Sequence, residues 1–194
     1  MKTIANQVRK IDVGNSFEKE IIITSSAVDT DGEVVWHYHG VDYLLREDIS
    51  LGSDLGTKLI IEPGCTLKFP IGGEIWVGYS SDIGYIEAEG TAELPITFTT
   101  NAAFPENGNW DGIWFYANAG SGNKFDHCNF SYGGETDNGN ITIKTEDGNK
   151  VSITNSSFSH SAGYGIYRKY PLDGTPPFMD NNTFSDNTQG DINW

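Results

Sequence analysis

Aromatic and basic side chains in the second half of the chain are the residues best suited to chemistry. Trp114 and Tyr116 alternate with apolar residues, so they lie on the outer side of an extended strand. Lys144, Tyr167 and Lys169 hold similar outer positions in two later segments. Aromatic faces can pack on the C–H groups of sugars while nearby polar groups bond the hydroxyls. We therefore expect a carbohydrate-binding face made of Trp110, Trp114, Tyr116, Lys144, Tyr167 and Lys169. The alternative is that a loop, a terminal cap or a neighbouring domain covers these rings.

Metal ligands are sparse by comparison. Residues 29–33, Asp-Thr-Asp-Gly-Glu, begin like a Ca²⁺ loop but lack its later ligands. Residues 135–137 form a second acidic turn, and His37 and His39 share one side of a strand without a third ligand. We therefore expect no cofactor. If a metal did bind, Ca²⁺ is the ion that such acidic turns would suit.

Composition excludes several classes of partner. The chain has 194 residues, a length that fits a single domain, and its formal net charge is −15. A protein needs a basic face to bind nucleic acid or anionic lipid, so we expect neither as a partner. No apolar run approaches the roughly 20 residues of a membrane span, and the first residues do not resemble a signal peptide. Cys65 and Cys128 are too few for a disulfide framework, and we expect both to be buried.

The strongest pattern is an internal repeat. Phe130, Phe158 and Phe184 follow one another at 28 and 26 residues, each followed by Ser. The residue three places before each Phe is His127, Asn155 or Asn181. Apolar and polar residues alternate around these positions, which indicates short strands with one buried side.

Further columns repeat every 25 to 29 residues. One inner column contains Ile86, Ile113, Ile141, Ile166 and Ile192, and another contains Phe69, Phe98, Phe125, Ile153 and Met179. The outer column beside the first contains Glu87, Trp114, Thr142, Tyr167 and Asn193. Strands that repeat at this pitch predict a coil in which each turn stacks on the last at about 4.8 Å. An antiparallel sandwich is the alternative, but a sandwich gives no reason for the columns to stay in phase.

Two segments carry a family resemblance. Residues 155–159 (Asn-Ser-Ser-Phe-Ser) with 163–166 (Gly-Tyr-Gly-Ile), and residues 181–185 with 190–192, resemble right-handed parallel β-helix repeat proteins. Pectate lyases and polygalacturonases have this architecture, and residues 59–69 and 90–98 resemble openings found in exported bacterial members. The resemblance implies an all-β, right-handed parallel β-helix of about five turns over residues 58–194. Residues 1–57 do not join the columns, so we expect them to form an N-terminal cap.

Function is less constrained than fold. We expect a non-catalytic module, carbohydrate-binding or structural, at an extracellular or cell-surface location, whose partner is a polysaccharide or glycan. Other domains of a longer chain are further expected partners. One alternative is a polysaccharide lyase or glycoside hydrolase, although Arg168-Lys169 is a poor version of the Arg-x-Lys of polygalacturonases. A second alternative is an adhesin or stalk segment. Ice binding is not expected, because no Thr-x-Thr ladder repeats in the sequence.

Arg168 stands out within this pattern. By register it falls on the inner side with Phe115 and Ile143. A buried Arg without partners is very costly, so we expect the last turn to leave register and Arg168 to face solvent. The alternative is a partnered Arg at a site.

Overall fold

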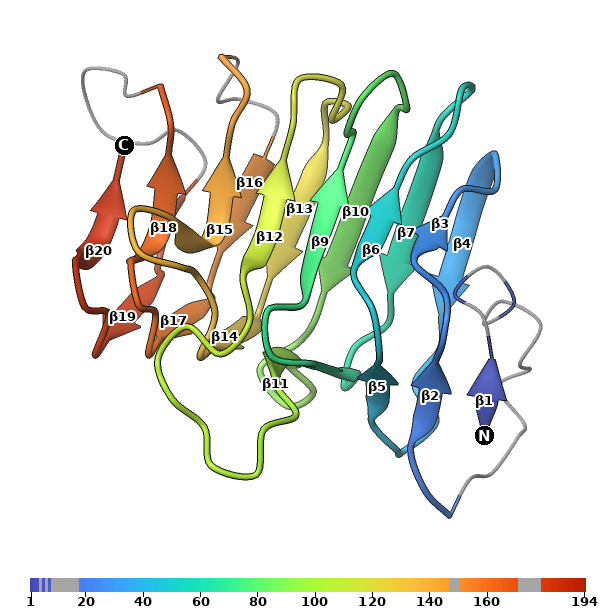
Figure 1. Ribbon diagram of the computed structural model, residues 1–194, viewed down its shortest axis with the longest axis horizontal. Coiled ribbons are helices and arrows are strands. Elements are labelled where there is room, and N and C mark those ends of the chain that lie inside the picture. The colour runs from blue at the N-terminus through green and yellow to red at the C-terminus, as the bar shows by residue number, and fades with distance from the viewer. Residues whose placement is uncertain (4, 6, 8–17, 147–150, 171–178) are drawn as a thin grey trace.

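The computed structural model describes residues 1–3, 5, 7, 18–146, 151–170 and 179–194. Its strands form three sheets in which every paired strand runs parallel to its neighbour. The chain passes from one sheet to the next in a fixed order and stacks about six turns of a parallel β-helix. Figure 1 shows the turns side by side along the long axis, with the two ends of the chain at opposite ends of the coil. The predicted fold class is confirmed, with about one turn more than expected.

Each turn contributes one strand to each sheet where the turn is complete. The eight-stranded sheet contains β1 (Lys2–Thr3), β2 (Ile21–Ile23), β5 (Tyr43–Leu45), β8 (Thr66–Phe69), β11 (Ile96–Thr100), β14 (Cys128–Ser131), β17 (Ser157–Ser159) and β19 (Thr183–Ser185). The seven-stranded sheet contains β3 (Ala27–Val28), β6 (Ile49–Leu51), β9 (Glu74–Val77), β12 (Gly112–Phe115), β15 (Gly139–Ile143), β18 (Tyr164–Arg168) and β20 (Gly190–Asn193). The five-stranded sheet contains β4 (Gly32–Trp36), β7 (Thr57–Ile61), β10 (Gly84–Glu89), β13 (Asn123–Asp126) and β16 (Val151–Thr154). Among the described residues, no helix is long and apolar enough to cross a membrane.

Stacked aromatic rings fill the core behind the eight-stranded sheet. Phe98 lies on Phe130 and Phe130 lies on Phe158, with ring centroids 4.7 and 4.8 Å apart and nearly parallel planes. Phe158 continues onto Phe184 at 5.4 Å. The register pairs Phe130 with Phe158 and Phe158 with Phe184, as the repeat predicted. These contacts follow because side chains of neighbouring parallel strands lie directly beside one another.

The polar residues three places before each Phe form one corner of the coil. His127, Asn155 and Asn181 have φ angles of 49°, 50° and 58°, the left-handed conformation that Asn tolerates better than most residues. Asn155 donates a hydrogen bond from Nδ2 to Oδ1 of Asp126 at 2.7 Å, and Asn181 donates to Oδ1 of Asn155 at 3.2 Å. The side chains of this corner are therefore linked from turn to turn.

The other predicted columns mix two sheets. Ile113 pairs with Ile75 in the seven-stranded sheet, whereas Ile86 pairs with Leu59 in the five-stranded sheet. Likewise, Phe98 pairs with Phe130 in the eight-stranded sheet, whereas Phe125 lies on β13 of the five-stranded sheet. The error has a physical cause: residues 101–111, between β11 and β12, lengthen one turn (yellow-green in Figure 1), so a constant pitch loses the register there.

The coil begins earlier than residue 58. Strands β2, β3 and β4 pair in register with β5, β6 and β7, and so join all three sheets. Residues 21–51 are therefore part of the coil rather than a separate cap. Residues 4, 6 and 8–17 of the predicted cap lie outside the described residues.

Arg168 keeps its register and points into the coil. It pairs with Ile143 and is fully buried, so the expectation that it faces solvent is wrong. Its Nε donates a 2.5 Å hydrogen bond to the carbonyl of Tyr170, and Nη2 donates one of 2.6 Å to the carbonyl of Glu146. The guanidinium carbon also lies 4.9 Å from the centre of the Trp194 ring. Backbone carbonyls and an aromatic face thus compensate the buried charge.

Candidate functional site

The outer side of the seven-stranded sheet carries a row of large side chains. The register places Trp76 beside Trp114, Trp114 beside Thr142, and Thr142 beside Tyr167. Asn193 follows Tyr167 at the C-terminal end of the row. The predicted order from Trp114 to Asn193 is therefore confirmed, and Trp76 takes the place that was predicted for Glu87.

Lys144 lies over the rings of both Trp114 and Tyr116. The Lys144 Nζ lies 3.7 Å from the centre of the Trp114 ring and 5.3 Å from the centre of the Tyr116 ring. Trp114 is only 6% exposed, and its Nε1 donates a 2.8 Å hydrogen bond to the carbonyl of Asp111. Burial, together with the neighbouring charge of Lys169, lowers the pKa of Lys144. The charged group of Lys144 therefore covers the ring that was expected to be open.

Trp76 and Tyr79 extend this aromatic group and were missed by the sequence reasoning. The Trp76 and Tyr79 ring centres are 5.4 Å apart, and Tyr79 meets Tyr116 edge to face at 4.9 Å. Tyr79 is 48% exposed, which makes it the most open ring of the group. We call Trp76, Tyr79, Tyr116 and Trp114 the aromatic strip. The available signal was Glu74-Ile75-Trp76-Val77, which alternates like the strand that contains Trp114.

Trp110 does not belong to this surface. It is fully buried and stacks on Phe69, with ring centres 4.2 Å apart and planes 9° from parallel. Its Nε1 donates a 2.8 Å hydrogen bond to the carbonyl of Ser131. Trp110 therefore fills the core at the end of the long connection before β12, and its prediction as a ligand contact is corrected.

Tyr167 and Lys169 lie farther along the same sheet. Tyr167 is half-buried in the outer row, where its ring is 5.8 Å from that of Tyr164. Lys169 is exposed, with Nζ 5.4 Å from the centre of the Tyr170 ring. Thr142 separates Tyr167 from Trp114 in the row. Tyr167 and Lys169 therefore form a second group and are not part of the strip.

Carboxyl groups border the strip at the beginning of the strands. Burial raises the pKa of Glu74 to about 7, and the charges of Asp111, Asp48 and Glu135 act in the same direction while a hydrogen bond from Trp76 opposes them. Burial, with the charges of Glu135 and Asp48, raises the pKa of Asp111 to about 6. These two carboxyls are therefore able to hold protons near neutral pH. In the part of the chain that the structure describes, no three His, Cys, Asp or Glu residues form a group suited to a metal ion.

A groove of about 580 Å³ adjoins Trp76. Its lining combines one indole ring with charged and hydroxyl side chains and the backbone of a Gly pair. The residues are Ser26, Arg46, Glu47, Asp48, Ser50, Pro70, Ile71, Gly72, Gly73 and Trp76. This mixture suits a ligand that offers both apolar faces and hydroxyl groups.

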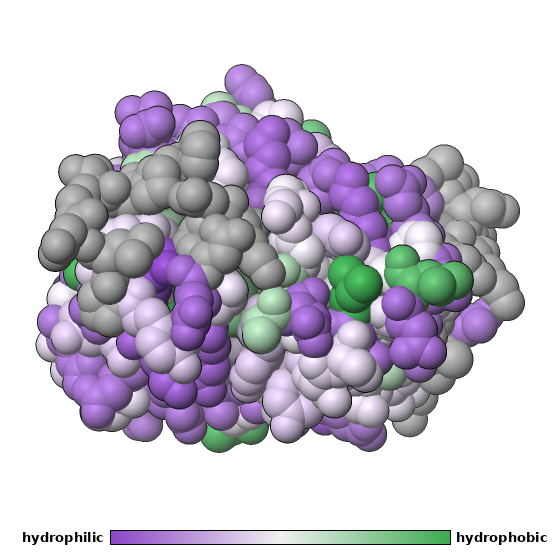
Figure 2. Space-filling model, turned by 90° about the horizontal axis from the view of Figure 1, so that it is seen from above, coloured by the Kyte–Doolittle hydropathy of each residue, from purple (hydrophilic) through white to green (hydrophobic). Residues whose placement is uncertain are grey.

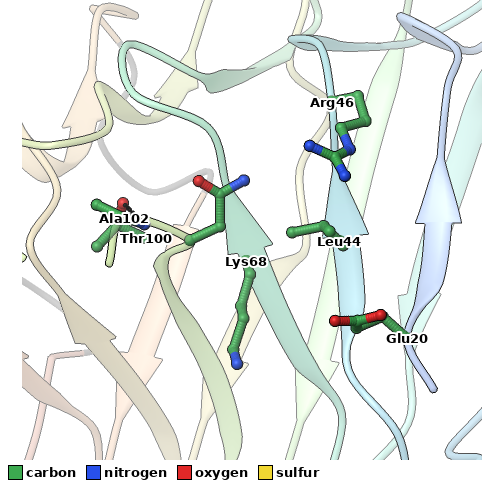
Figure 3. Close-up of a pocket in the computed structure, with 7 residues that line it drawn as sticks. Glu20, Leu44, Arg46, Lys68, Thr100 and Ala102 are labelled. Carbon is green, nitrogen blue, oxygen red and sulfur yellow. Dashed lines mark hydrogen bonds between the residues drawn. The ribbon is translucent and has the colours of Figure 1, made fainter. Parts of the chain in front are cut away.

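A second hollow, of about 310 Å³, lies on the neighbouring eight-stranded sheet. Figure 3 shows the guanidinium of Arg46 directed toward this hollow from above Leu44, while Lys68 extends away along its own strand. Lys68 is held by Asp42 at 2.6 Å, which leaves its charge balanced. Arg46 lines both hollows and so connects them along the surface.

The edge that carries the turns between the seven- and five-stranded sheets is mostly polar. Figure 2 views the molecule from above and shows a hydrophilic surface with scattered apolar spots. Leu55 and Tyr79 are among the exposed apolar side chains of these turns. Scattered apolar groups are ordinary for a protein surface, so the visible part of this edge does not mark an apolar docking surface.

Comparison with protein-family models, curated proteins and solved structures returned no match to this chain. The chemical interpretation of the site therefore depends on the geometry of its own residues.

Proposed function

We propose that this protein is a non-catalytic carbohydrate-binding module of the cell surface or extracellular space. The observation that carries the proposal is the aromatic strip, in which Trp76, Tyr79 and Tyr116 are in successive ring contact beside a polar groove. Rings of this kind supply apolar stacking surfaces at a low cost in conformational entropy, while the groove supplies hydrogen-bonding groups.

The charge of the chain narrows the ligand class. A formal net charge of −15 disfavours polyuronates and other anionic chains, so the expected ligand is a neutral or basic polysaccharide. Asp48 and Arg46 in the groove would accept and donate hydrogen bonds to sugar hydroxyls.

One observation favours a second candidate function, glycoside hydrolysis. Glu74 and Asp111 are half-buried carboxyls at the edge of the strip, and the pKa of each is raised toward neutrality. Hydrolysis of a glycosidic bond needs one carboxyl that is protonated and another that is ionised. The two candidates share the same surface and differ in whether the bound sugar is cleaved.

A glycan array tests the binding proposal. The wild type should bind one family of neutral or basic glycans, and Trp76→Ala and Tyr79→Ala should lose that signal. Phe104→Ala, an 88% exposed ring that is not part of the strip, is the matched control and should bind normally. A blank array, or equal signals from all four proteins, would contradict the proposal.

Hydrolysis is tested on the polysaccharide that the array identifies. Release of reducing ends by the wild type, abolished in Glu74→Gln and Asp111→Asn, would favour the hydrolase. Binding without release of reducing ends supports the non-catalytic module.

A further inference from the structure

Two hollows in the N-terminal half of the coil belong to one continuous path. The smaller hollow, of about 310 Å³, lies on the eight-stranded sheet, and the larger, of about 580 Å³, adjoins Trp76 on the seven-stranded sheet. Arg46, at the corner between the two sheets, lines both of them. Together the hollows are longer than a single sugar and suit several units of a chain.

Two successive turns of the coil build this path. Leu44 pairs with Lys68 at the smaller hollow, and Ser50 pairs with Trp76 at the larger one. Tyr79 follows Trp76 in the same turn, with the ring centres 5.4 Å apart. The path therefore runs with the strands and crosses the coil, whereas the turns themselves stack along its long axis (Figure 1).

Arg46 offers unused hydrogen-bond donors in the middle of the path. Its guanidinium points toward the smaller hollow (Figure 3), and none of the ion pairs formed between described residues includes it. Lys68 in the same hollow is held by Asp42 instead, at 2.6 Å. A guanidinium carries five N–H donors, and those of Arg46 are therefore available to the oxygens of a sugar.

A chain that ran along the coil axis would instead meet a covered ring. The outer row of the seven-stranded sheet leads from Trp76 to Trp114. Trp114 is only 6% exposed, and Nζ of Lys144 lies 3.7 Å from the centre of its ring. The axial route thus closes beside Trp76, while Tyr79, which is 48% exposed, continues the crossing path.

The walls of the path come from the flanking turns. Asn101 and Ala102 begin the long connection before β12 and border the smaller hollow, and Ser26 from an earlier turn borders the larger one. The N–H of Gly72 donates a 2.8 Å hydrogen bond to the carbonyl of Asn109, which ties the corner to the same long connection. The insertion therefore shapes the path at this turn.

We propose that the ligand is a linear glycan chain of several sugars that lies across the coil over residues 44–50 and 68–79. Trp76 and Tyr79 hold one end of the bound segment, Arg46 bonds its middle, and the hollow beside Ala102 receives the other end. The inference rests on the proposed function, since it takes a glycan as the occupant. It adds that several successive sugars of the chain are bound, so affinity rises with chain length.

The test is a microarray of size-separated fragments of cellulose, xylan, mannan, starch and chitin, from disaccharide to octasaccharide. A series of protein concentrations gives an apparent dissociation constant for each length. Within the series that binds, the octasaccharide should bind about tenfold more tightly than the disaccharide, because it reaches both hollows.

Variants locate the two ends of the bound chain. Ala102→Trp fills the smaller hollow, so it should weaken octasaccharide binding to the level of the disaccharide and leave disaccharide binding unchanged. Ala92→Trp is the matched control, because Ala92 is an exposed Ala in the turn between β10 and β11. Trp76→Ala should weaken binding at every length, and Tyr167→Ala, on the axial route, should bind every length as the wild type does.

The outcomes separate this inference from the proposed function. Equal affinity for disaccharide and octasaccharide, with loss in Trp76→Ala, would overturn the crossing path and leave the binding module standing. Loss in Tyr167→Ala with normal binding in Ala102→Trp would show that the chain follows the coil axis. A wild type that binds no fragment would overturn both. If circular dichroism shows that Ala102→Trp is unfolded, Asn101→Trp replaces it, since Asn101 borders the same hollow.

Discussion

Lys144 lies over the face of Trp114, with its ammonium nitrogen 3.7 Å from the centre of the ring. Trp114 is buried as a result, whereas Trp76 and Tyr79 remain accessible on the same surface. The open part of the aromatic strip is therefore its N-terminal half, beside the groove that Trp76 lines. Ligand contact with Trp114 would require Lys144 to move.

Removal of Lys144 should expose the Trp114 ring. Lys144→Ala is expected to increase acrylamide quenching of tryptophan fluorescence and to lower the free energy of unfolding by about 0.5–1 kcal/mol through loss of the cation–π contact. Lys124→Ala, a surface Lys on the five-stranded sheet, serves as the control and should leave quenching unchanged. Equal quenching in Lys144→Ala and the wild type would show that this Lys does not cover the ring.

The raised pKa of Glu74 predicts a specific pH dependence of stability. Because the folded state holds this proton more tightly than the unfolded state, the contribution of Glu74 to stability falls as pH rises from about 4.5 to about 7. Glu74→Gln removes this loss, so the variant should gain stability relative to the wild type over that window. The gain should be about 1 kcal/mol, since the half-exposed side chain is partly screened.

Chemical denaturation at several pH values measures this difference. Glu62 and Asp126 have lowered pKa values and act in the opposite direction, so only the difference between wild type and variant isolates Glu74. A difference that stays constant from pH 4 to 8 would contradict the raised pKa.

The stacked Phe column should carry a large share of the stability. Phe158→Ala removes a fully buried ring that contacts Phe130 and Phe184, and should cost about 3–5 kcal/mol. Phe104→Ala removes an exposed ring and should change stability by less than about 0.5 kcal/mol. Urea unfolding compares the two, and similar losses would argue against the stacked core.

Arg168 should stabilise the C-terminal end of the coil. Arg168→Leu leaves the carbonyls of Glu146 and Tyr170 without these donors, and should cost about 2–4 kcal/mol. Arg46→Leu, at an exposed position, is the control. Hydrogen exchange should accelerate in β18 and β20 of the Arg168 variant. A loss no greater than that of the control would contradict the assigned role.

The repeat predicted those parts of the fold in which successive turns have similar lengths. Phe130, Phe158 and Phe184 were placed correctly because short connections keep their pitch near 27 residues. Trp76 was missed because it precedes Trp114 by 38 residues, a distance that includes the long connection before β12. A constant pitch cannot describe a turn that contains an insertion.

Other features of the site depend on three-dimensional surroundings. Trp110 precedes Gly112, whose φ of 97° interrupts the extended backbone, so alternation along the strand does not predict the direction of its side chain. The raised pKa values of Glu74 and Asp111 depend on burial and on charges from other turns. Spacing alone put Arg168 on the inner side, but we expected it to leave register because its carbonyl partners come from loop segments that the repeat does not describe.

The most direct test of the account is isothermal titration with the oligosaccharide that the array selects. Wild type and Phe104→Ala should bind with the same dissociation constant, and Trp76→Ala should bind about tenfold more weakly, which corresponds to about 1.4 kcal/mol. An unchanged dissociation constant in both Trp76→Ala and Tyr79→Ala would contradict the claim that the aromatic strip holds the glycan.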